Sequence, residues 1–432
     1  MSQEKRLLLI LAAVQFCHII DFMIIMPLGK TIMGVFDISP GQFAWLVSAY
    51  AGAALVGNLI STAFIDRFDR RTALLFLFCG FTLGTFACAF APTYFSLLVF
   101  RASTGIFGGT LGALVLAIVG DVIPLERRGA AIGWVMTAFS VASVVGVPSG
   151  IWIAAEYGWS APFVATAMIS SAFVVLAYFI VPSLRGHLDD QAQPQVQEKD
   201  RKAMEAAIDT AALQEANLPP AGMALAPKHG LRKVVDPFVR IFSDANQRAA
   251  LLFTMTLMLG HFTVIPFIAP YMQINIGFED KQVGLIYLIG GLLTVVLLPF
   301  FGKLSDRYGR MLVFTTASVF SLASIYALTN LDTDSIFLAL LATSSFFVVA
   351  SGRNVPATTM ITSVVRPENR GGFMSIRQSI NEMALFASTL VAGFIITEGP
   401  DGKLEHYEWL GYFTMLMSVI AVWAASRIRS VA

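Results

Sequence analysis

Long apolar runs separated by short polar segments recur along the whole chain of 432 residues. A helix needs about 20 mainly apolar residues to cross the hydrocarbon core of a bilayer. The pattern therefore predicts an all-α integral membrane protein. Twelve membrane-spanning helices are predicted, over residues 7–28, 42–65, 72–91, 95–122, 130–154, 160–182, 247–272, 282–302, 311–330, 335–363, 372–397 and 408–426.

The first apolar run carries polar side chains in its middle, Gln15, His18 and Asp21, and it lacks a small-residue cleavage site. A secretory signal peptide has an uninterrupted apolar centre followed by such a site. We therefore interpret this run as a retained helix.

Residues 184–245 interrupt the pattern. They contain the polar run QAQPQVQEKD at 191–200 and then an alanine-rich stretch with helical spacing. We interpret this segment as a cytoplasmic linker that carries at most one helix lying along the membrane. It divides the chain into an N-terminal six-helix bundle, residues 1–183, and a C-terminal six-helix bundle, residues 246–432.

Composition narrows the function classes. Only 13% of the residues are charged and 56% are apolar, whereas a soluble domain carries about 25% charged residues. This excludes a soluble enzyme, a disordered protein and a nucleic-acid-binding protein, and the net charge of +1 attracts no polyanion. The three cysteines lie in apolar runs without a CxxC or Cys/His cluster. Neither a disulfide framework nor a metal or other cofactor is predicted.

The positions of lysine and arginine predict the topology. With the N-terminus in the cytoplasm, inner loops and inner helix ends carry 14 basic residues, whereas the outer loops carry only Lys30, Lys281 and Lys403. Basic loops are retained on the cytoplasmic side. Both termini are therefore predicted to be cytoplasmic, in a multi-pass protein of the cell inner membrane. A missed helix would reverse the bias halfway along the chain, and no reversal occurs.

The two halves of the chain share sequence features at an offset of 240 residues. The segment DRFDRR at 66–71 follows the second predicted helix, and DRYGR at 306–310 follows the eighth. The same offset relates Asp21 to His261. Repeats of equal orientation are related by an axis along the membrane normal, with a substrate site between them near the midplane.

Two six-helix bundles with an Asp-Arg-x-x-Arg loop in each resemble the major facilitator superfamily over nearly the whole chain except the linker. The segment GKLSDRYGR at 302–310 fits the loop motif of the family closely. The first copy departs from it, with Thr62 and Asp69 at positions where the family has glycine. The resemblance implies a monomeric transporter of two six-helix bundles in pseudo-twofold arrangement.

The resemblance also implies a function for the loop charges, which in the family latch the cytoplasmic side in the outward-open state. Asp121, at the inner end of the fourth helix, is a natural partner for Arg70. The alternative is that these charges only anchor the loops inside, which we favour for Arg71, Arg127 and Arg128. The predicted latch residues are Asp66, Arg67, Arg70, Asp121, Asp306, Arg307 and Arg310.

The fifth predicted helix contains a run of small residues and proline, Gly146-Val147-Pro148-Ser149-Gly150. Glycine lets helices approach closely, and proline bends a helix and frees a carbonyl group. The run resembles, with altered spacing, the Gly-Pro-x-x-Gly-Gly motif of the proton-driven exporters of the family, the drug- and sugar-efflux branch. We predict a hinge formed by Gly146, Pro148 and Gly150, with ordinary helix packing as the alternative.

Few ionisable side chains fall within the predicted spans. They are the acids Asp21 and Glu382 and the arginines Arg101, Arg353 and Arg377. An ionisable group at membrane depth costs several kcal/mol, so it normally faces a cavity or a partner and is a functional candidate.

Asp21 is the strongest candidate for carrying a proton. His18 lies one turn away on the same helix face. Arg101 begins RASTG, which resembles the helix-four motif implicated in proton coupling in the family, and could stabilise the charged carboxylate. The predicted cavity also includes His261 and Asn381, together with the charged residues Arg353, Arg377 and Glu382. As alternatives, Arg377 reaches the inner surface, or Arg353 and Glu382 form a fixed pair.

The sequence contains no Walker A, HExxH or GxSxG segment, so neither an ATP-driven pump nor an enzyme is predicted. We predict a secondary active transporter that works by alternating access. Its partners would be a small-molecule substrate, protons and the bilayer. Proton-coupled export of a small organic or amphipathic molecule is favoured. The alternatives are uptake by proton symport, a facilitator, a lipid exporter or a non-transporting sensor.

Overall fold

The structure is a computed structural model that describes residues 3–64, 67–185, 241–365 and 370–431. In the N-terminal half the helices are α1 (Gln3–Ile24), α2 (Gly29–Phe36), α3 (Pro40–Phe64), α4 (Arg70–Ala89), α5 (Tyr94–Val122), α6 (Leu125–Val141), the π-helical segment η2 (Ala142–Gly146), α7 (Val147–Tyr157) and α8 (Ala161–Ile180). In the C-terminal half they are α11 (Ala245–Ile274), α12 (Asp280–Tyr308), α13 (Arg310–Thr329), α14 (Ile336–Thr362), α15 (Arg370–Ile395) and α16 (Tyr407–Ser426).

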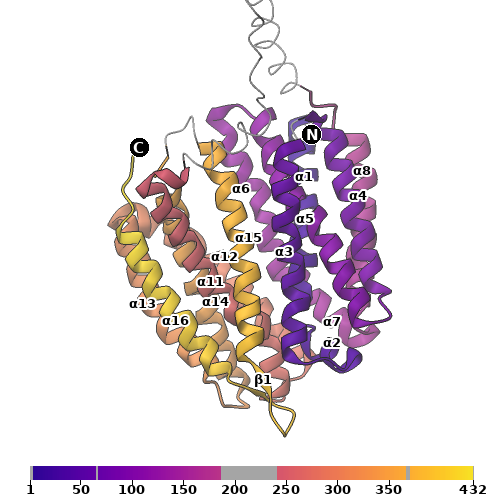
Figure 1. The fold of residues 1–432 in the computed structure, drawn as a ribbon, viewed down its shortest axis with the longest axis vertical. Helices are drawn as coiled ribbons and strands as arrows, with labels where there is room; N and C mark the ends of the chain where they lie inside the picture. The colour runs from indigo at the N-terminus through magenta and orange to yellow at the C-terminus, as the bar shows by residue number, and fades with distance from the viewer. Residues whose placement is uncertain (1–2, 65–66, 186–240, 366–369, 432) are drawn as a thin grey trace, which may run out of the picture.

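These helices form two bundles that lie side by side (Figure 1). Eleven segments of the described chain are long and apolar enough to cross a membrane, with α6, η2 and α7 forming one continuous span over Arg127–Tyr157. The helix α15 runs the length of the molecule beside α3 (Figure 1) and completes a set of twelve. The predicted all-α fold with twelve membrane helices in two bundles is therefore confirmed.

The observed helices differ from the predicted spans mainly at three ends. The fifth span was predicted to begin at residue 130, but α6 begins at Leu125. The first span was predicted to reach residue 28, but α1 ends at Ile24 and a short extra helix, α2, follows. The eighth was predicted to end at residue 302, but α12 continues to Tyr308 because its polar last turn still favours a helix. It ends before Gly309, whose φ of 92° suits glycine. A hairpin of β1 (Thr397–Glu398) and β2 (Leu404–Glu405) was not predicted.

The buried apolar residues show where the two halves meet. One core cluster joins both halves at the end of the molecule that carries α2 and the hairpin, and it includes Ile32 and Phe43 together with Phe267 and Met272. Near the chain termini, each half has a cluster of its own, one with Leu11 in the N-terminal half and one with Phe314 in the C-terminal half. Figure 1 shows the halves meeting at the lower end, opposite the termini.

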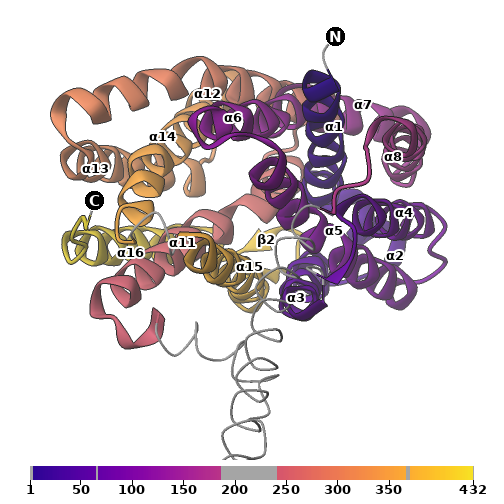
Figure 2. The ribbon, with the colours of Figure 1, turned by 90° about the horizontal axis from the view of Figure 1, so that it is seen from above.

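Two polar contacts strengthen this junction. Lys30 Nζ lies 3.4 Å from the carbonyl oxygen of Gln273, and Lys281 Nζ lies 3.1 Å from Glu156 Oε1. Seen from above, α12 packs beside α7 on one side of the junction and α15 beside α3 on the other (Figure 2). The molecule is thus closed at the end opposite the termini.

Most of the predicted linker, residues 186–240, lies outside the described residues. The proposed boundaries of the two six-helix bundles, at residues 183 and 246, remain a prediction.

Candidate functional site

A buried ion pair lies inside the N-terminal half, toward the end at which the two halves meet. Arg101 of α5 and Asp21 of α1 are both fully buried, and Nη1 of Arg101 lies 2.8 Å from Oδ2 of Asp21. The same Nη1 donates to the backbone carbonyl of Asp21 at 3.2 Å. Thr85 of α4 donates its hydroxyl to Asp21 Oδ1 at 3.0 Å. A buried charge needs hydrogen bonds as well as an opposite charge, and here α4 and α5 supply them to the Asp21 carboxylate.

Aromatic side chains enclose this pair. The guanidinium carbon of Arg101 lies 4.8 Å from the centroid of the Tyr50 ring, a cation–π distance. His18 and Phe22 place their rings 6.2 and 5.4 Å from the Tyr50 ring. Sequence reasoning missed Tyr50, because an aromatic residue in an apolar span gives no sign of which face it occupies.

Several polar atoms here have no hydrogen-bond partner within the described chain, namely Tyr50 Oη, His18 Nδ1, and Nε and Nη2 of Arg101. Buried polar atoms are normally paired, so each unpaired one requires an explanation such as a bound ligand or water. These atoms are therefore available for hydrogen bonds to a further polar group.

Glycines on α5 explain how Tyr50 comes so close to Arg101. A Cβ atom on Gly105 would lie 2.9 Å from the Tyr50 Cα atom, and one on Gly109 would lie 2.8 Å from the Ala54 Cα atom. Real Cβ atoms do not approach backbone this closely, so only glycine permits this packing of α3 on α5. The glycines that follow Arg101 on α5 thus bring the Tyr50 ring close to its guanidinium group.

The helix α15 of the C-terminal half carries a second acid, Glu382, which lies near the ion-pair region. Glu382 accepts a hydrogen bond of 2.8 Å from Gln378, one turn earlier. It lies within electrostatic range of Tyr50 in the other half. Phe386, one turn later, packs on Trp45 with ring centroids 6.4 Å apart. Glu382 therefore faces the N-terminal half.

Arg353 does not pair with Glu382, so that alternative from the sequence is wrong. Its Nη1 donates to the hydroxyl groups of Ser418 and Ser321 at 2.8 and 3.2 Å. The side chain is 1% exposed and lies among α13, α14 and α16. Within the described chain this buried guanidinium has hydroxyl partners and no ion pair.

The remaining predicted cavity residues lie apart from the ion pair. His261 stacks on Phe346 with ring centroids 6.1 Å apart, and it lies within electrostatic range of Arg353. Arg377 contacts Met374 Sδ at 4.0 Å, and Asn381 Oδ1 has no partner within the described chain. The predicted cavity residues thus form three separate groups, centred on Asp21, Glu382 and Arg353.

The predicted hinge lies at an irregularity of the fifth span. The π-helical turn η2 ends at Gly146, and Pro148 lies in the first turn of α7, which begins at Val147. A Cβ atom on Gly146 would lie 2.6 Å from Ile20 Cδ1, and one on Gly150 would clash with Ile24 Cδ1. Both glycines therefore pack against α1, close to Asp21. The hinge function remains a prediction.

On its other side the fifth span contacts the C-terminal half. A Cβ atom on Gly291 would lie 3.2 Å from the Ser143 carbonyl oxygen, and one on Gly284 would lie 2.6 Å from Trp152 Nε1. The fifth span is therefore in contact with both the ion-pair helix α1 and the α12 helix of the other half.

The loop charges form one of the anticipated pairs. Arg70 Nε lies 2.9 Å from Asp121 Oδ2, and both belong to the N-terminal half. Asp66 lies outside the described residues. Asp306 and Arg310 are exposed, and within the described chain no ion pair joins them to the other half. The latch function of Arg67, Arg307 and their neighbours remains a prediction.

Asp69, which departs from the family motif, has a structural function that sequence reasoning missed. Its carboxylate caps α4 by accepting from Arg71 N at 3.2 Å. It also accepts from Leu184 N at 2.7 Å and Ser183 Oγ at 2.9 Å, at the end of the first half. Partial burial raises the pKa of Asp69, but these hydrogen bonds and nearby Arg185 outweigh it and hold the pKa below its ordinary value.

Residues 11–245 and 250–431 match the sequence model of the Major Facilitator Superfamily. The inner membrane transport protein YdhP of Escherichia coli K12 is 32% identical over 146 residues, which are 34% of this chain and 38% of YdhP. Multidrug resistance protein 3 of Bacillus subtilis is 32% identical over 149 residues, 34% of this chain and 28% of that protein. Both alignments thus span less than half of the relative.

Among solved structures, the D-xylose–proton symporter superimposes with a TM-score of 0.70 at 16% identity, covering 99% of each chain. At this identity the likeness concerns the fold alone.

Proposed function

Since this chain belongs to the Major Facilitator Superfamily and is a multi-pass membrane transporter, we propose that it exports a small organic or amphipathic molecule in exchange for protons. The main support for this proposal is the fully buried ion pair of Asp21 and Arg101, to which three helices of one half contribute. A carboxylate at that depth can exchange a proton only together with a change in its pairing. Because the ion pair lies near the junction of the halves, a change in its pairing would affect how the two halves pack against each other.

A proton on Asp21 removes the charge that holds the Nη1 group of Arg101. The guanidinium then keeps the face of the Tyr50 ring and the backbone carbonyl of Asp21 as partners. The contact between α1 and α5 weakens without leaving the arginine unpartnered. Loss of the proton restores the ion pair, so the two protonation states favour different positions of α1.

The fifth span transmits this change to the other half. It contacts α1 through Gly146 and Gly150, and it contacts α12 through Ser143 and Trp152. A shift of α1 of about 1–2 Å is typical of helix movements in switching proteins, and it would alter the packing at both surfaces. Proton loading is thereby linked to the junction that closes one end of the molecule.

Both termini are proposed to be cytoplasmic, on the distribution of basic residues. The closed end is then the outer one. Phe22 and Phe262, whose rings lie 6.4 Å apart across the halves, would contact the apolar part of a substrate. The unpaired Tyr50 and His18 atoms would receive its polar part.

Export is favoured over uptake by the small-residue run of the fifth span and by the likeness to a protein named for multidrug resistance. Uptake by proton symport is the second candidate, supported by the shared fold of the D-xylose–proton symporter. The two directions use the same residues, so an experiment must separate them.

Purified protein in liposomes with an imposed pH gradient provides that test. A panel of cationic and neutral amphipathic dyes is offered outside, and dye uptake is measured together with the pH of the lumen. Exchange with protons predicts accumulation in an acidic lumen, whereas symport predicts accumulation in an alkaline one. Protein-free liposomes are the control. Dye movement without any change in lumenal pH would overturn proton coupling.

A further inference from the structure

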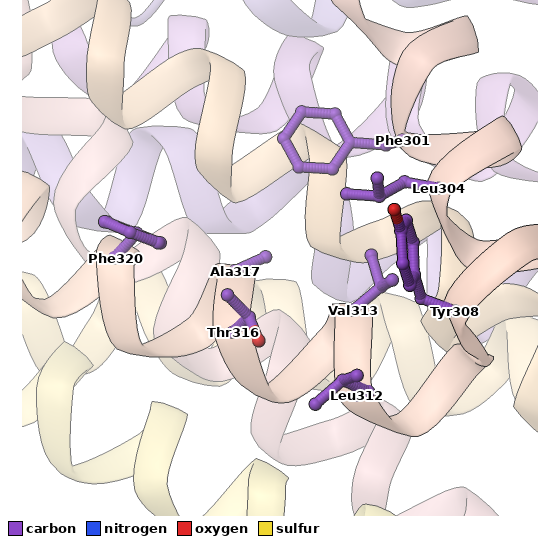
Figure 3. Close-up of a pocket in the computed structure, with 8 residues that line it drawn as sticks. All are labelled: Phe301, Leu304, Tyr308, Leu312, Val313, Thr316, Ala317 and Phe320. Atoms are coloured by element: carbon purple, nitrogen blue, oxygen red, sulfur yellow. The ribbon is translucent and has the colours of Figure 1, made fainter.

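Two apolar hollows lie on the outward faces of the bundles, away from the ion pair. The first lies between α12 and α13, has a cavity volume of about 280 Å³, and is bordered by Tyr308, Leu312 and Phe320. Figure 3 shows side chains of the two helices facing one another across it, with Tyr308 towards one end and Phe320 towards the other. The second, of about 440 Å³, lies among α3, α4 and α5 and is bordered by Phe68 and Phe76.

The two hollows occupy equivalent places in the internal repeat. Subtracting the offset of 240 from the lining residues of the first gives lining residues of the second in six of eight cases. The equivalent pairs are Ser61 with Phe301, Phe68 with Tyr308, Thr72 with Leu312, Ala73 with Val313, Phe76 with Thr316, and Leu77 with Ala317. A shape that recurs at the same repeat positions is a property of the repeat and not a local packing defect.

Each hollow has small or buried residues at its floor and large exposed residues at its rim. Ala317 and Val313 are 5% and 4% exposed, whereas Leu312 and Phe320 are 59% and 64% exposed. The rim lies on membrane-spanning helices and faces outward, where hydrocarbon replaces water. A flexible apolar chain fits such a hollow better than a rigid polar solute.

Positive charges at one end of each hollow indicate that a ligand with an apolar chain would also carry a negatively charged group. Both hollows extend to the loops with a repeated basic residue, Arg67 next to Phe68 in one half and the equivalent Arg307 next to Tyr308 in the other. Arg307 stacks over Tyr308, which lines the hollow, at 5.3 Å. Basic side chains at the membrane surface attract anionic lipids by about 1 kcal/mol each.

We propose that each half of the protein binds one anionic phospholipid on its outward face, with an acyl chain in the hollow and the phosphate beside the loop arginines. The chain would then carry two such lipids, related by the internal repeat. This proposal does not depend on the transport direction or on proton coupling.

Native mass spectrometry of the detergent-purified full chain tests it, with phosphatidylglycerol or phosphatidylcholine added. The expected result is retention of two phosphatidylglycerol molecules per chain and several-fold weaker retention of phosphatidylcholine. Ala317→Phe fills the floor of one hollow, and Thr316→Trp obstructs its rim in case the first variant folds poorly. Each should reduce the number retained from two to one.

Ala323→Phe provides a matched control, since Ala323 is exposed on α13 but does not line the hollow. This variant should still retain two lipids. Equal retention of both lipid types would refute the arginine–phosphate part of the proposal. An unchanged count in both hollow variants, or an equal loss in the control, would refute the site itself.

Discussion

A carboxylate and a guanidinium that are both fully buried depend on each other for neutralisation, and Asp21 and Arg101 are in this position. Removing one partner of a buried pair usually destabilises a protein by about 3–5 kcal/mol, because the other charge remains uncompensated. A loss of transport after a single substitution can therefore have either a structural or a functional cause.

We expect Asp21→Asn to abolish transport driven by a pH gradient, because the amide retains the shape but cannot carry the proton. The measurement is dye flux into liposomes with an imposed pH gradient, and the rate should fall to that of protein-free liposomes. Normal gradient-driven flux in this variant would remove Asp21 from the mechanism.

The double variant Asp21→Asn with Arg101→Gln separates the two causes. Both charges are absent, so the thermal stability should recover most of what the single variant loses. Transport driven by a proton gradient should remain absent. Recovery of that transport in the double variant would show that the pair is only structural.

Asp69 supplies a second prediction for a single residue. Asp69→Ala removes the cap of α4 and the hydrogen bonds to Ser183 and Leu184, and loss of a helix cap costs about 1 kcal/mol. Thermal unfolding in detergent should show the loss, while Asp69→Asn, which can still cap the helix, should show less of it.

The same residue has a defined pH dependence. Because the pKa of Asp69 lies below its ordinary value of 3.8 in the folded chain, its stabilisation is present above that value. It is lost as the pH falls through the folded-state value. The difference in stability between the wild type and Asp69→Asn should therefore be constant near neutral pH and disappear in acid. A difference that grows in acid would contradict this account.

At the scale of single elements, the fifth span packs against both the ion-pair helix α1 and the α12 helix of the other half. Gly146→Leu places a side chain where Ile20 now packs, and overpacking typically costs about 1–3 kcal/mol. If that cost falls on one conformer of the cycle, turnover should slow about ten-fold, which corresponds to about 1.4 kcal/mol. Dye flux in liposomes measures it.

Gly133→Leu is the matched control in the same span, since a Cβ atom on Gly133 would meet no heavy atom of the described chain within 4 Å. It should transport at the wild-type rate. Equal slowing of both variants would mean that helix propensity, and not contact with α1, explains the effect.

At the scale of the whole molecule, alternating access requires the closed end to open. Glu156 and Lys281 are exposed and pair across the halves at that end, 3.1 Å apart. Replacing both with cysteine and joining them with a short bifunctional thiol reagent should stop transport, because the junction can no longer separate. Measuring flux before and after cleavage of the reagent tests reversibility.

The control joins two residues of one half. Glu4 and Arg127 form an exposed pair of 3.0 Å within the N-terminal half, so they should move together during the cycle. The same reagent between cysteines at these positions should leave transport nearly unchanged. Continued transport with the Glu156–Lys281 positions linked would refute a cycle in which that end opens.

The sequence by itself determined the membrane helices, because the length and hydropathy of each run reflect the thickness of the bilayer, which acts on every span separately. It also determined the repeat and the few charged residues worth examining, since charges within apolar runs are rare. The pairing of Arg70 with Asp121 could be predicted, because each residue lies at the end of a predicted helix and both ends are on the same side of the membrane. These inferences require only local pattern and the physics of the membrane.

Only the tertiary structure decided which buried groups meet. Helical periodicity does not show which face of an apolar span is turned inward, so the place of Tyr50 on Arg101 and of Arg353 among serines could not be read from the sequence. The same holds for the repeat-related hollows and the closed end. These features arise from contacts between helices distant in the chain, whose energies depend on packing that no local pattern encodes.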